Sequence, residues 1–288
     1  MQPTPPLPRL PSLGKAVAAF SAAQLVTLLA GMAWLLLQAD ALPPAHAFVC
    51  VAALGAGLWA IGAGLKGELS APEVFVVAAG ALATAGSATG LDSVYQVFKP
   101  LALLLLIGLA LQRWRALGLR PSCGGLLAAG LVFSLAGDVF LLFEGFFIAG
   151  LVAFLLAHIC YIGLFRQGVG WFPRRAALAA TLLAGAAMYA FLFPHLGPVL
   201  KVAVAAYTLV IALMAAQAIG RAAVLRDKAA AGVAAGAVFF MVSDTLLAIN
   251  RFAMPLPLAQ FWVLGTYYVA QVLIARNILA APQLTLRR

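Results

Sequence analysis

The sequence predicts a polytopic α-helical membrane protein with about ten spanning helices. Hydrophobic residues make up 65% of the 288 residues, charged residues make up only 9%, and the mean hydropathy is +1.07. A soluble domain of this length carries roughly 25% charged residues, so most of the surface of this protein faces lipid. The apolar runs continue along the whole chain, which excludes a soluble domain attached to a single membrane anchor.

Ten apolar runs meet the length of about 20 residues that an α-helix needs to cross the hydrocarbon core. The run at 73–90 is short and rich in Ala, Gly, Ser and Thr, which makes it the least typical of the ten. The expected helices cover residues 14–37, 46–65, 73–90, 97–113, 122–143, 147–166, 174–193, 198–217, 229–250 and 257–279.

The distribution of basic residues tests this helix count independently. In a ten-helix arrangement, alternate connections and the two termini hold all but three of the 18 basic residues, the exceptions being Lys99, Lys201 and Arg251. Such asymmetry is expected from the positive-inside rule, so both termini are expected in the cytoplasm and the number of helices is expected to be even. The Ala-, Leu- and Arg-rich composition favours a bacterial plasma membrane. No basic run contains interleaved aromatic residues, so the net charge of +10 does not indicate nucleic-acid binding.

The first apolar run resembles a signal peptide, because the sequence Ala-Asp-Ala follows it at 39–41. Its apolar stretch of about 22 residues is longer than a normal signal core, so an uncleaved first helix is expected. The cysteines, Cys50, Cys123 and Cys160, lie within or at the ends of expected helices and have no metal-like spacing. They are expected to be small buried apolar residues.

An internal repeat relates two segments of the second half of the chain. Residues 130–141 (GLVFSLAGDVFL) match residues 236–247 (GAVFFMVSDTLL) with a constant offset of 106 positions, and the same offset relates Tyr161 to Tyr267. The fifth and sixth helices are therefore expected to be a copy of the ninth and tenth. Parallel copies imply a pseudo-two-fold axis along the membrane normal, which places equivalent residues at equal depth.

Two aspartates are the central candidates for function. Six of the eight acidic residues fall in loops or at helix ends, whereas Asp138 and Asp244 fall inside the fifth and ninth expected helices. A charge at bilayer depth costs at least ~2.5–3.5 kcal/mol, so such residues normally face the bundle interior and have a function. At a rise of 1.5 Å per residue, both lie about 22–24 Å from the cytoplasmic ends of their helices, in the outer third of the membrane. The alternative is a structural role, in which neutral aspartates form hydrogen bonds between helices.

Two helix faces are expected to bring further polar side chains to this depth. Residues spaced by four, three and four positions lie on one face of a helix. These sets are Phe154, His158, Tyr161 and Phe165 on the sixth helix, and Gln260, Leu264, Tyr267 and Gln271 on the tenth.

Three more side chains complete a predicted polar cavity that opens toward the outer half of the membrane. Ser134 lies one turn before Asp138, and Lys99 and Arg251 lie at the outer ends of the fourth and ninth helices. Taken singly, each cation could extend its side chain to the interface, and a single intramembrane His or Tyr is as often a packing residue. Together, apolar walls and two cations at the rim suit an amphiphile with an anionic head group.

The sequence resembles the YhhN-like lysoplasmalogenase family. The motifs that carry the resemblance are residues 134–138 (SLAGD), 146–162 (FFIAGLVAFLLAHICYI) and 236–252 (GAVFFMVSDTLLAINRF), supported by 99–101 (KPL) and 267–271 (YYVAQ). The resemblance covers roughly residues 73–280, which would be the eight helices of the family. Residues 73–288 are therefore expected to form an eight-helix membrane domain. Residues 1–72 are expected to form an extension with two additional helices.

The resemblance implies hydrolysis of the vinyl ether bond of a lysoplasmalogen, giving a fatty aldehyde and glycerophosphoethanolamine or glycerophosphocholine. Vinyl ethers hydrolyse by protonation of the β-carbon, and water then captures the oxocarbenium ion. This chemistry requires an acid and a base or charge stabiliser, the division of labour of paired carboxylates in glycosidases. Two nearby carboxyl groups in a poorly solvated site do not both ionise, so one keeps its proton. We expect Asp138 and Asp244 to form this pair, without assigning the acid.

The remaining candidate residues are expected to bind or orient the substrate. His158, Tyr161 and Tyr267 would orient the carboxyl pair or a water molecule, and Lys99 and Arg251 would hold phosphate. No cofactor or metal is expected, because one intramembrane His with two separated Asp is a poor metal site. The complete set of expected substrate-binding or orienting residues is Lys99, Ser134, His158, Tyr161, Tyr207, Ser243, Arg251, Tyr267 and Gln271.

Three other classes of protein share some of these features. A proton-coupled transporter also has many helices, an internal repeat and buried carboxylates, and it remains the main alternative. Against it, the helices of the two aspartates carry no Pro or Gly break at those positions beyond Gly137. An intramembrane aspartyl protease would need Gly-x-Gly-Asp, which fails at Leu135, and its second Asp would follow a Tyr. A purely structural membrane protein is the third alternative.

Overall fold

The computed structural model describes residues 44–67, 69–117 and 120–281, and within these ranges the protein is all-α. The expected helix at 14–37 and the choice between a signal peptide and a spanning helix lie outside the described residues. The nine α-helices within the described ranges are α2 (Pro44–Leu65), α3 (Ala71–Thr89), α4 (Asp92–Leu117), α5 (Pro121–Phe140), α6 (Phe147–Phe165), α7 (Arg175–Leu192), α8 (Pro198–Leu225), α9 (Lys228–Ala248) and α10 (Ala259–Leu279).

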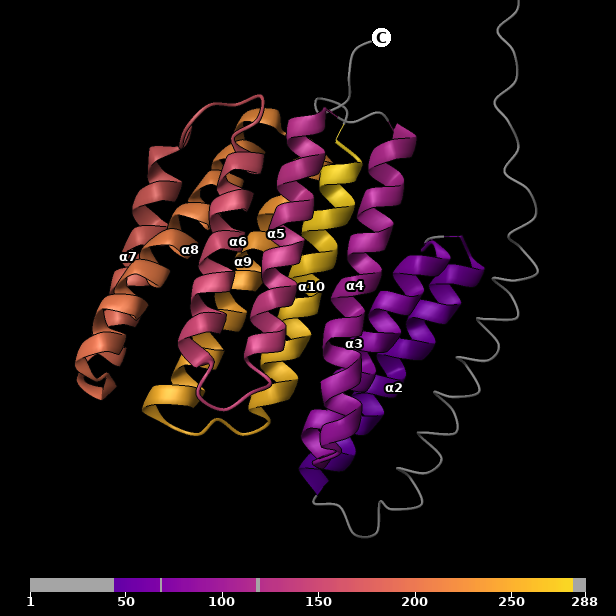
Figure 1. Cartoon of the computed structure of the whole chain (residues 1–288). Helices are drawn as coiled ribbons and strands as arrows, with labels where there is room; N and C mark the ends of the chain where they lie inside the picture. The colour runs from indigo at the N-terminus through magenta and orange to yellow at the C-terminus, as the bar shows by residue number, and fades with distance from the viewer. Residues whose placement is uncertain (1–43, 68, 118–119, 282–288) are drawn as a thin grey trace, which may run out of the picture.

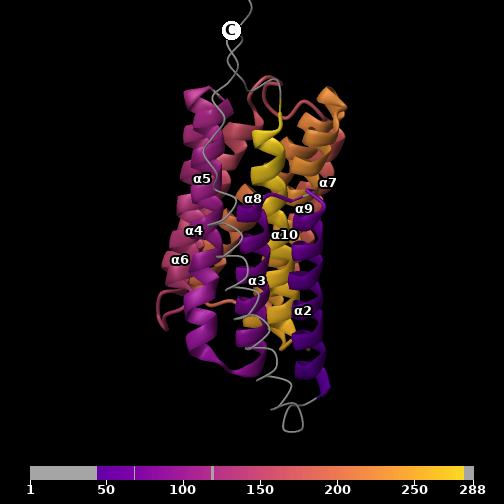
Figure 2. The same ribbon diagram turned by 90° about the vertical axis from the view of Figure 1, so that its right-hand side faces the viewer.

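The helices form an up-and-down bundle in which chain neighbours run antiparallel (Figure 1). Helix α7 lies at one edge of the bundle and α2 with α3 at the other, and the view turned by 90° shows α10 running through the bundle beside α3 and α9 (Figure 2). The connections after α5, α7 and α9 gather at the lower end in Figure 1, and those after α4, α6 and α8 gather at the upper end. Every expected helix within the described ranges is therefore confirmed as a helix.

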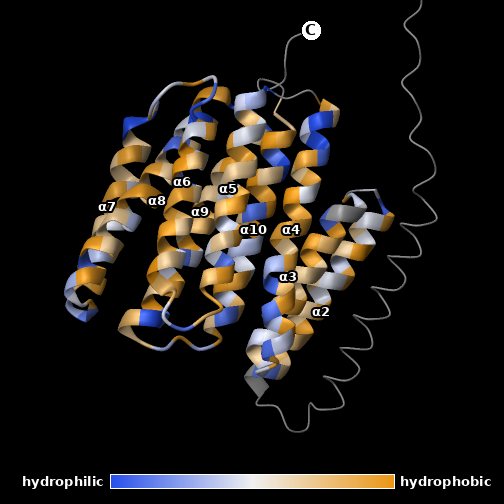
Figure 3. Cartoon of the chain, viewed as in Figure 1, coloured by the Kyte–Doolittle hydropathy of each residue, from blue (hydrophilic) through white to orange (hydrophobic). Residues whose placement is uncertain are grey.

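The helices of this bundle are mostly hydrophobic (Figure 3), and many large apolar side chains, such as Leu183 and Val202, are exposed on the outside, as a lipid-facing surface requires. Seven of the described helices are long and apolar enough to cross a membrane, so the protein is an integral membrane protein. Helices α3 and α10 are not among these seven, and the expectation of about ten spans is therefore shown only in part. Helix α10 falls short because its inner face carries polar side chains such as Tyr267, Tyr268 and Gln271, which are buried in the bundle. Polar residues within a membrane normally take this interior position.

Local sequence signals explain the ends of the short helix α3. The Ser70 amide donates to a Glu73 carboxylate oxygen at 2.7 Å, which forms the capping box expected from a Ser-x-x-Glu sequence. Gly90 ends the helix with a φ of 71°, a left-handed conformation that favours glycine. Glu73 also forms ion pairs with Arg113 at 3.3 Å and with Arg276 at 3.7 Å. These contacts connect the start of α3 to α4 and α10.

Three helix boundaries differ from the sequence prediction and change the position of site residues. Helix α4 begins at Asp92 rather than 97, because an aspartate in the first turn stabilises a helix N-terminus. Lys99 is consequently two turns inside α4 instead of at its outer end. Helix α5 ends at Phe140, which puts Asp138 in its last turn. Helix α9 ends at Ala248 and continues as a π-helical turn, Ile249–Ala253.

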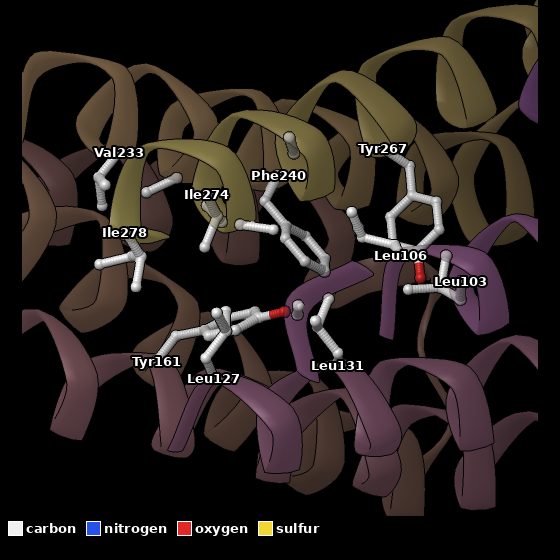
Figure 4. Close-up of a cluster of buried hydrophobic side chains, with 14 of the residues drawn as sticks. Leu103, Leu106, Leu127, Leu131, Tyr161, Val233, Phe240, Tyr267, Ile274 and Ile278 are labelled. Carbon is white, nitrogen blue, oxygen red and sulfur yellow. The ribbon is translucent and has the colours of Figure 1, made fainter. Parts of the chain in front are cut away.

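The core of the bundle is built from apolar side chains of α3, α4, α5, α6, α8, α9 and α10, and Figure 4 shows part of it. In Figure 4, Phe240 points into the cluster between Tyr161 and Tyr267, and its ring centroid lies 5.4 Å from that of Tyr267. Helices α5 and α6 approach closely because Gly130 has no side chain. The Tyr161 ring occupies the space that a Cβ at Gly130 would need. The cysteines fit the expected packing role in part, since two are buried and the third is half-buried.

Hydrogen bonds from two side chains of α8, Gln217 and Arg221, hold the connection between α6 and α7 against α8. The Gln217 side chain accepts from the Phe172 amide at 2.7 Å and donates to the Gly170 carbonyl at 2.8 Å. One turn later, Arg221 donates to the carbonyl oxygens of Phe165 and Gln167. These bonds satisfy backbone groups in a connection where Phe172 has a φ of 41°, an uncommon conformation for a bulky residue.

Replacing Gln217 with leucine should destabilise the protein by about 2 kcal/mol. The substitution preserves side-chain size but leaves the Phe172 amide and the Gly170 carbonyl without their partner, and each such loss costs roughly 1–3 kcal/mol when the group stays buried. Thermal unfolding in detergent measures the change. Gln167→Leu is the matched control, because Gln167 takes part in these hydrogen bonds through its backbone carbonyl, which the substitution retains. Equal stability of the two variants would contradict the prediction.

Candidate active site

Two buried carboxyl groups lie near one end of the bundle, on α5 and α9. The side chain of Asp138 is 2% exposed and that of Asp244 is 15% exposed. Tyr267, which donates a hydrogen bond to Asp138, lines the same cavity as Asp244. The two aspartates that the sequence singled out are thus neighbours within one buried region, and their surroundings differ.

Asp138 forms an ion pair with a lysine of α4. The Nζ of Lys99 lies 3.5 Å from Oδ1 of Asp138, and the hydroxyl of Tyr267 donates to Oδ2 at 2.7 Å. Lys99 also donates to the hydroxyl of Tyr95, one turn earlier, at 3.2 Å. Its placement at the rim of the cavity was wrong, because the longer α4 carries it into the interior, where it is 4% exposed. An ion pair in the interior needs additional hydrogen bonds to offset the desolvation of its two charged groups, and Tyr95 and Tyr267 provide them.

Asp244 lies among aromatic groups of α6, α8 and α9. The hydroxyl of Tyr207 donates to Oδ2 of Asp244 in a short hydrogen bond, and Nε2 of His158 lies 3.9 Å from the same oxygen. The fully buried imidazole packs against the rings of Phe240 and Tyr207, with centroid distances of 4.6 and 5.3 Å. Neither ring nitrogen of His158 has a hydrogen-bond partner among the described residues. Among the described residues, no lysine or arginine forms an ion pair with Asp244 as Lys99 does with Asp138.

Each aspartate is contacted by a side chain from the other helix pair of the internal repeat. Tyr267 of the α9–α10 pair donates to Asp138 of the α5–α6 pair, whereas His158 of the α5–α6 pair faces Asp244 of the α9–α10 pair. The ring of Phe240 packs against both His158 and Tyr267, with ring centroids 4.6 Å and 5.4 Å apart, respectively. Each aspartate thus depends on the other pair for a polar neighbour.

Four of the expected orienting residues lie one layer away from the carboxyl groups. The Tyr161 hydroxyl donates to the side-chain oxygen of Gln271 at 2.8 Å, with the buried Ser134 beside it. Ser243 donates to the backbone carbonyl of Val263 at 2.9 Å, which connects α9 to α10. These side chains join the helices that carry the aspartates, and their observed hydrogen bonds do not go to either carboxyl group.

A polar cavity of about 1030 Å³, including its mouth, opens beside the aspartates. Asp244, Lys99 and Tyr267 line it on the inner side. Arg251 lies at the outer end, in the π-helical turn after α9, with its guanidinium 5.5 Å from the centre of the Phe147 ring. The wall is completed by the connection between α5 and α6 and by the start of α10.

A second cavity, with about 700 Å³ of empty space including its opening, is lined almost entirely by apolar side chains of α6, α7, α8 and α9. Asp244 lines both cavities, together with four apolar residues: Leu141, Phe147, Phe154 and Leu247. The Asp244 carboxyl group therefore stands at the boundary between a polar chamber and an apolar chamber, and Asp138 does not line either one.

Sequence reasoning missed two features of this site. Tyr95 was not considered, although a helix starting at Asp92 would have placed it one turn before Lys99 on the same face. The apolar chamber was not anticipated either, because its lining residues are ordinary Leu, Met, Val and Phe of four helices. Only the packing of α7 on α8 reveals that these residues leave a space.

Comparison with known proteins agrees with the resemblance in the sequence. The profile of the YhhN family matches residues 94–278, which starts inside α4 rather than at residue 73. The chain is 36% identical over 153 residues to lysoplasmalogenase TMEM86A of Bos taurus, covering 51% of this chain and 62% of that protein. It is 36% identical over 159 residues to lysoplasmalogenase TMEM86B of Sus scrofa, covering 55% and 65%. It is 33% identical over 156 residues to the lysoplasmalogenase of Mycobacterium bovis, covering 51% and 58%.

The matched region spans about three fifths of the length of these curated relatives. No solved structure shows significant similarity to the chain. The family profile covers more than half of the chain and includes both aspartates, Lys99 and the aromatic residues around them. The chain therefore belongs to the YhhN family.

Proposed function

We propose that this protein hydrolyses the vinyl ether bond of lysoplasmalogens, releasing a fatty aldehyde and glycerophosphoethanolamine or glycerophosphocholine. One observation carries the proposal: the Asp244 carboxyl group borders both the polar and the apolar chamber. In a lysoplasmalogen, the vinyl ether joins the polar glycerophospho group to the hydrocarbon chain. A substrate with its head in one chamber and its chain in the other has its reactive bond at Asp244. The names of the related proteins support the same activity.

The polar chamber suits the glycerophospho group. Arg251 supplies a guanidinium at its mouth, where a phosphate can be bound without leaving water completely. Lys99 also lines this chamber, but its ammonium group is already paired with Asp138. Arg251 is therefore the main phosphate-binding residue in this proposal, and Lys99 adds a positive potential from deeper in the chamber.

The different surroundings of the two aspartates assign their roles. Asp138 is paired with Lys99 and lines neither chamber, so it acts as an ionised carboxylate whose negative potential stabilises developing positive charge at a distance. Asp244 has no such cation, lies at the reacting bond and acts as the general acid. Tyr207 fixes the orientation of Asp244 by donating to one oxygen, which leaves the other oxygen to carry the proton. This is the division of roles found in carboxylate pairs that act on acetals.

The reaction then proceeds in three steps that balance in protons and electrons. Asp244 gives its proton to the β-carbon of the vinyl ether, and the electron pair of the double bond forms the new C–H bond. Water attacks the resulting oxocarbenium carbon and returns a proton to Asp244, which gives a hemiacetal. The hemiacetal carbon–oxygen bond to glycerol breaks, the glycerol oxygen takes up a proton and the hemiacetal hydroxyl loses one, which yields the aldehyde. His158, whose Nε2 lies 3.9 Å from Oδ2 of Asp244, would position this carboxyl group, because the imidazole is fully buried and lines neither chamber.

The same proposal gives the site an orientation in the membrane. The cavities lie toward the end of the bundle where α5 joins α6 and α9 joins α10 (Figure 1). Most basic residues belong to the connections at the opposite end, which the positive-inside rule assigns to the cytoplasm. We therefore propose that the site faces the non-cytoplasmic side of a bacterial plasma membrane, with both termini in the cytoplasm. Residues 1–72 would be an addition to the family domain.

Aldehyde release from a synthetic lysoplasmalogen by purified protein in detergent tests the proposed activity. The parallel substrates are an ester lysophospholipid and a saturated alkyl-ether lysophospholipid with the same head group and chain length. Aldehyde formed from the vinyl ether, with both analogues intact, is the expected result, because only the vinyl ether has a carbon that can accept a proton. Cleavage of the ester alone would contradict the proposal. Folded protein that cleaves none of the three would favour a transporter.

A further inference from the structure

We infer that the apolar chamber between α7 and α9 binds the hydrocarbon chain of the substrate and sets its preferred length. This inference rests on the proposed function for the identity of the amphiphile. The chamber is assigned from its position, its lining and its connection to Asp244.

The chamber exists because α7 packs mainly against α8 and contacts the α9 segment chiefly at the π-helical turn beyond it. Residues of α7 and α9 nevertheless line the same cavity, so that cavity fills the space between these two helices. Gly185 on α7 marks the close approach to α8, because a Cβ there would lie 3.1 Å from a methyl group of Thr208. The bundle thus holds α7 at a distance from α9 by packing it on α8.

The lining chemistry matches an unbranched hydrocarbon chain. Apart from Asp244, Tyr207 and two threonines, the walls consist of Leu, Ile, Val, Met, Phe, Ala and Gly side chains. Thr245, one of these threonines, donates its hydroxyl to the Met241 carbonyl of its own helix at 2.7 Å, so it offers a methyl group to the space. A polar solute would find almost no partner in this chamber.

The chamber is also close to the lipid phase. Gly185 and Thr208 line a second, shallower groove of about 570 Å³ that runs between α7 and α8 and also includes Leu182 and Tyr189. Helix α7 is at the edge of the bundle, and its Leu183 is 71% exposed on the outer surface (Figure 1). A hydrocarbon chain therefore meets apolar surface on both sides of the contact between α7 and α8. A lipid is a more suitable occupant than a solute arriving from water.

Met188 is the position that tests the chamber. It lies on α7, across the chamber from α9 and Asp244, and it is half-buried, so its replacement leaves the proposed chemistry in place. Met188→Trp fills the far side of the chamber, and Met188→Ala enlarges it. Leu183→Trp and Leu183→Ala are the matched controls, because they make similar changes on the lipid-facing side of the same helix.

The experiment measures binding of saturated alkyl-ether lysophospholipids of increasing chain length to the full-length protein in detergent, below the concentration at which these lipids form micelles. Each methylene that enters an apolar site strengthens binding by about fourfold. With Met188→Trp, the affinity should stop increasing at a shorter chain length than in the wild type. For longer chains, the affinity should fall below that of the wild type by about fourfold for each methylene that the tryptophan excludes. With Met188→Ala, the affinity should continue to increase up to a longer chain length than in the wild type. The Leu183 variants should follow the wild-type series.

Failure of this inference and failure of the proposed function give different results. Because the alkyl ethers contain no vinyl ether bond, a shifted chain-length limit without any aldehyde release from lysoplasmalogens would support the chamber and overturn the hydrolase. Aldehyde release with the same chain-length series in both Met188 variants and in the wild type would overturn the chamber and leave the hydrolase intact.

Discussion

Replacing Asp244 with asparagine should reduce aldehyde release by about 10²–10⁴-fold, the contribution typical of a positioned general acid. Asparagine keeps the size of the side chain but has no acidic proton to give to the β-carbon. It can still accept the hydrogen bond from Tyr207, so the local packing is retained. Turnover is measured by aldehyde release at saturating lysoplasmalogen, and folding is checked by thermal unfolding.

Asp92→Asn is the matched control for this variant, since Asp92 is exposed at the start of α4 and does not line either chamber. Wild-type turnover is expected for the control. Binding of a saturated alkyl-ether lysophospholipid should be nearly unchanged in Asp244→Asn, because the defect lies in proton transfer. A variant that keeps a tenth or more of the wild-type turnover would rule out Asp244 as the acid.

Replacing Lys99 with methionine should destabilise the protein by about 3–5 kcal/mol, the cost of leaving a buried charge without its partner. Lys99 is 4% exposed and its ammonium group lies 3.5 Å from Asp138. Methionine fills nearly the same space, so the effect comes mainly from the unpaired carboxylate. The measurement is thermal or denaturant unfolding of the purified protein in detergent.

The double variant Lys99→Met/Asp138→Asn separates this effect from lost packing. Removing both charges eliminates the unpaired group, so the double variant should be more stable than Lys99→Met alone, while remaining inactive. Lys201→Met is the control, because its Nζ lies 4.0 Å from the Phe193 ring and it forms no ion pair with a described acidic residue. A double variant as unstable as the single one would show that the ion pair does not account for the position of Lys99.

The fold was largely predictable because its strongest signals are local. Each apolar run encodes a helix whose length is set by the membrane, and the ends follow capping residues such as Ser70 and Gly90. Hydropathy alone is a weaker signal for α10, because Tyr267 and Gln271 lower its hydropathy while they face the interior. Sequence periodicity identified the inner face of this helix correctly, since Leu264, Tyr267 and Gln271 are all buried.

The sequence predicted only those site residues whose charge is unusual within an apolar helix. A carboxyl group inside an apolar helix is conspicuous, so Asp138 and Asp244 could be identified without a structure. Their different partners could not, because the pairing of Lys99 with Asp138 depends on a helix boundary and that of Tyr207 with Asp244 depends on how α8 packs on α9. The apolar chamber is a property of packing among four helices, and no single residue signals it.

Hydrolysis of a lysoplasmalogen in D₂O, with the aldehyde trapped chemically as it forms, is the measurement that tests the proposed mechanism most directly. Protonation of the β-carbon by the Asp244 carboxyl group, which exchanges its proton with the solvent, predicts an aldehyde with one deuterium at the carbon next to the carbonyl. Mass spectrometry of the trapped product detects it, and Asp244→Asn should yield almost none of this product. An aldehyde without deuterium would contradict the mechanism, because the vinyl ether would then have been cleaved without proton transfer to carbon.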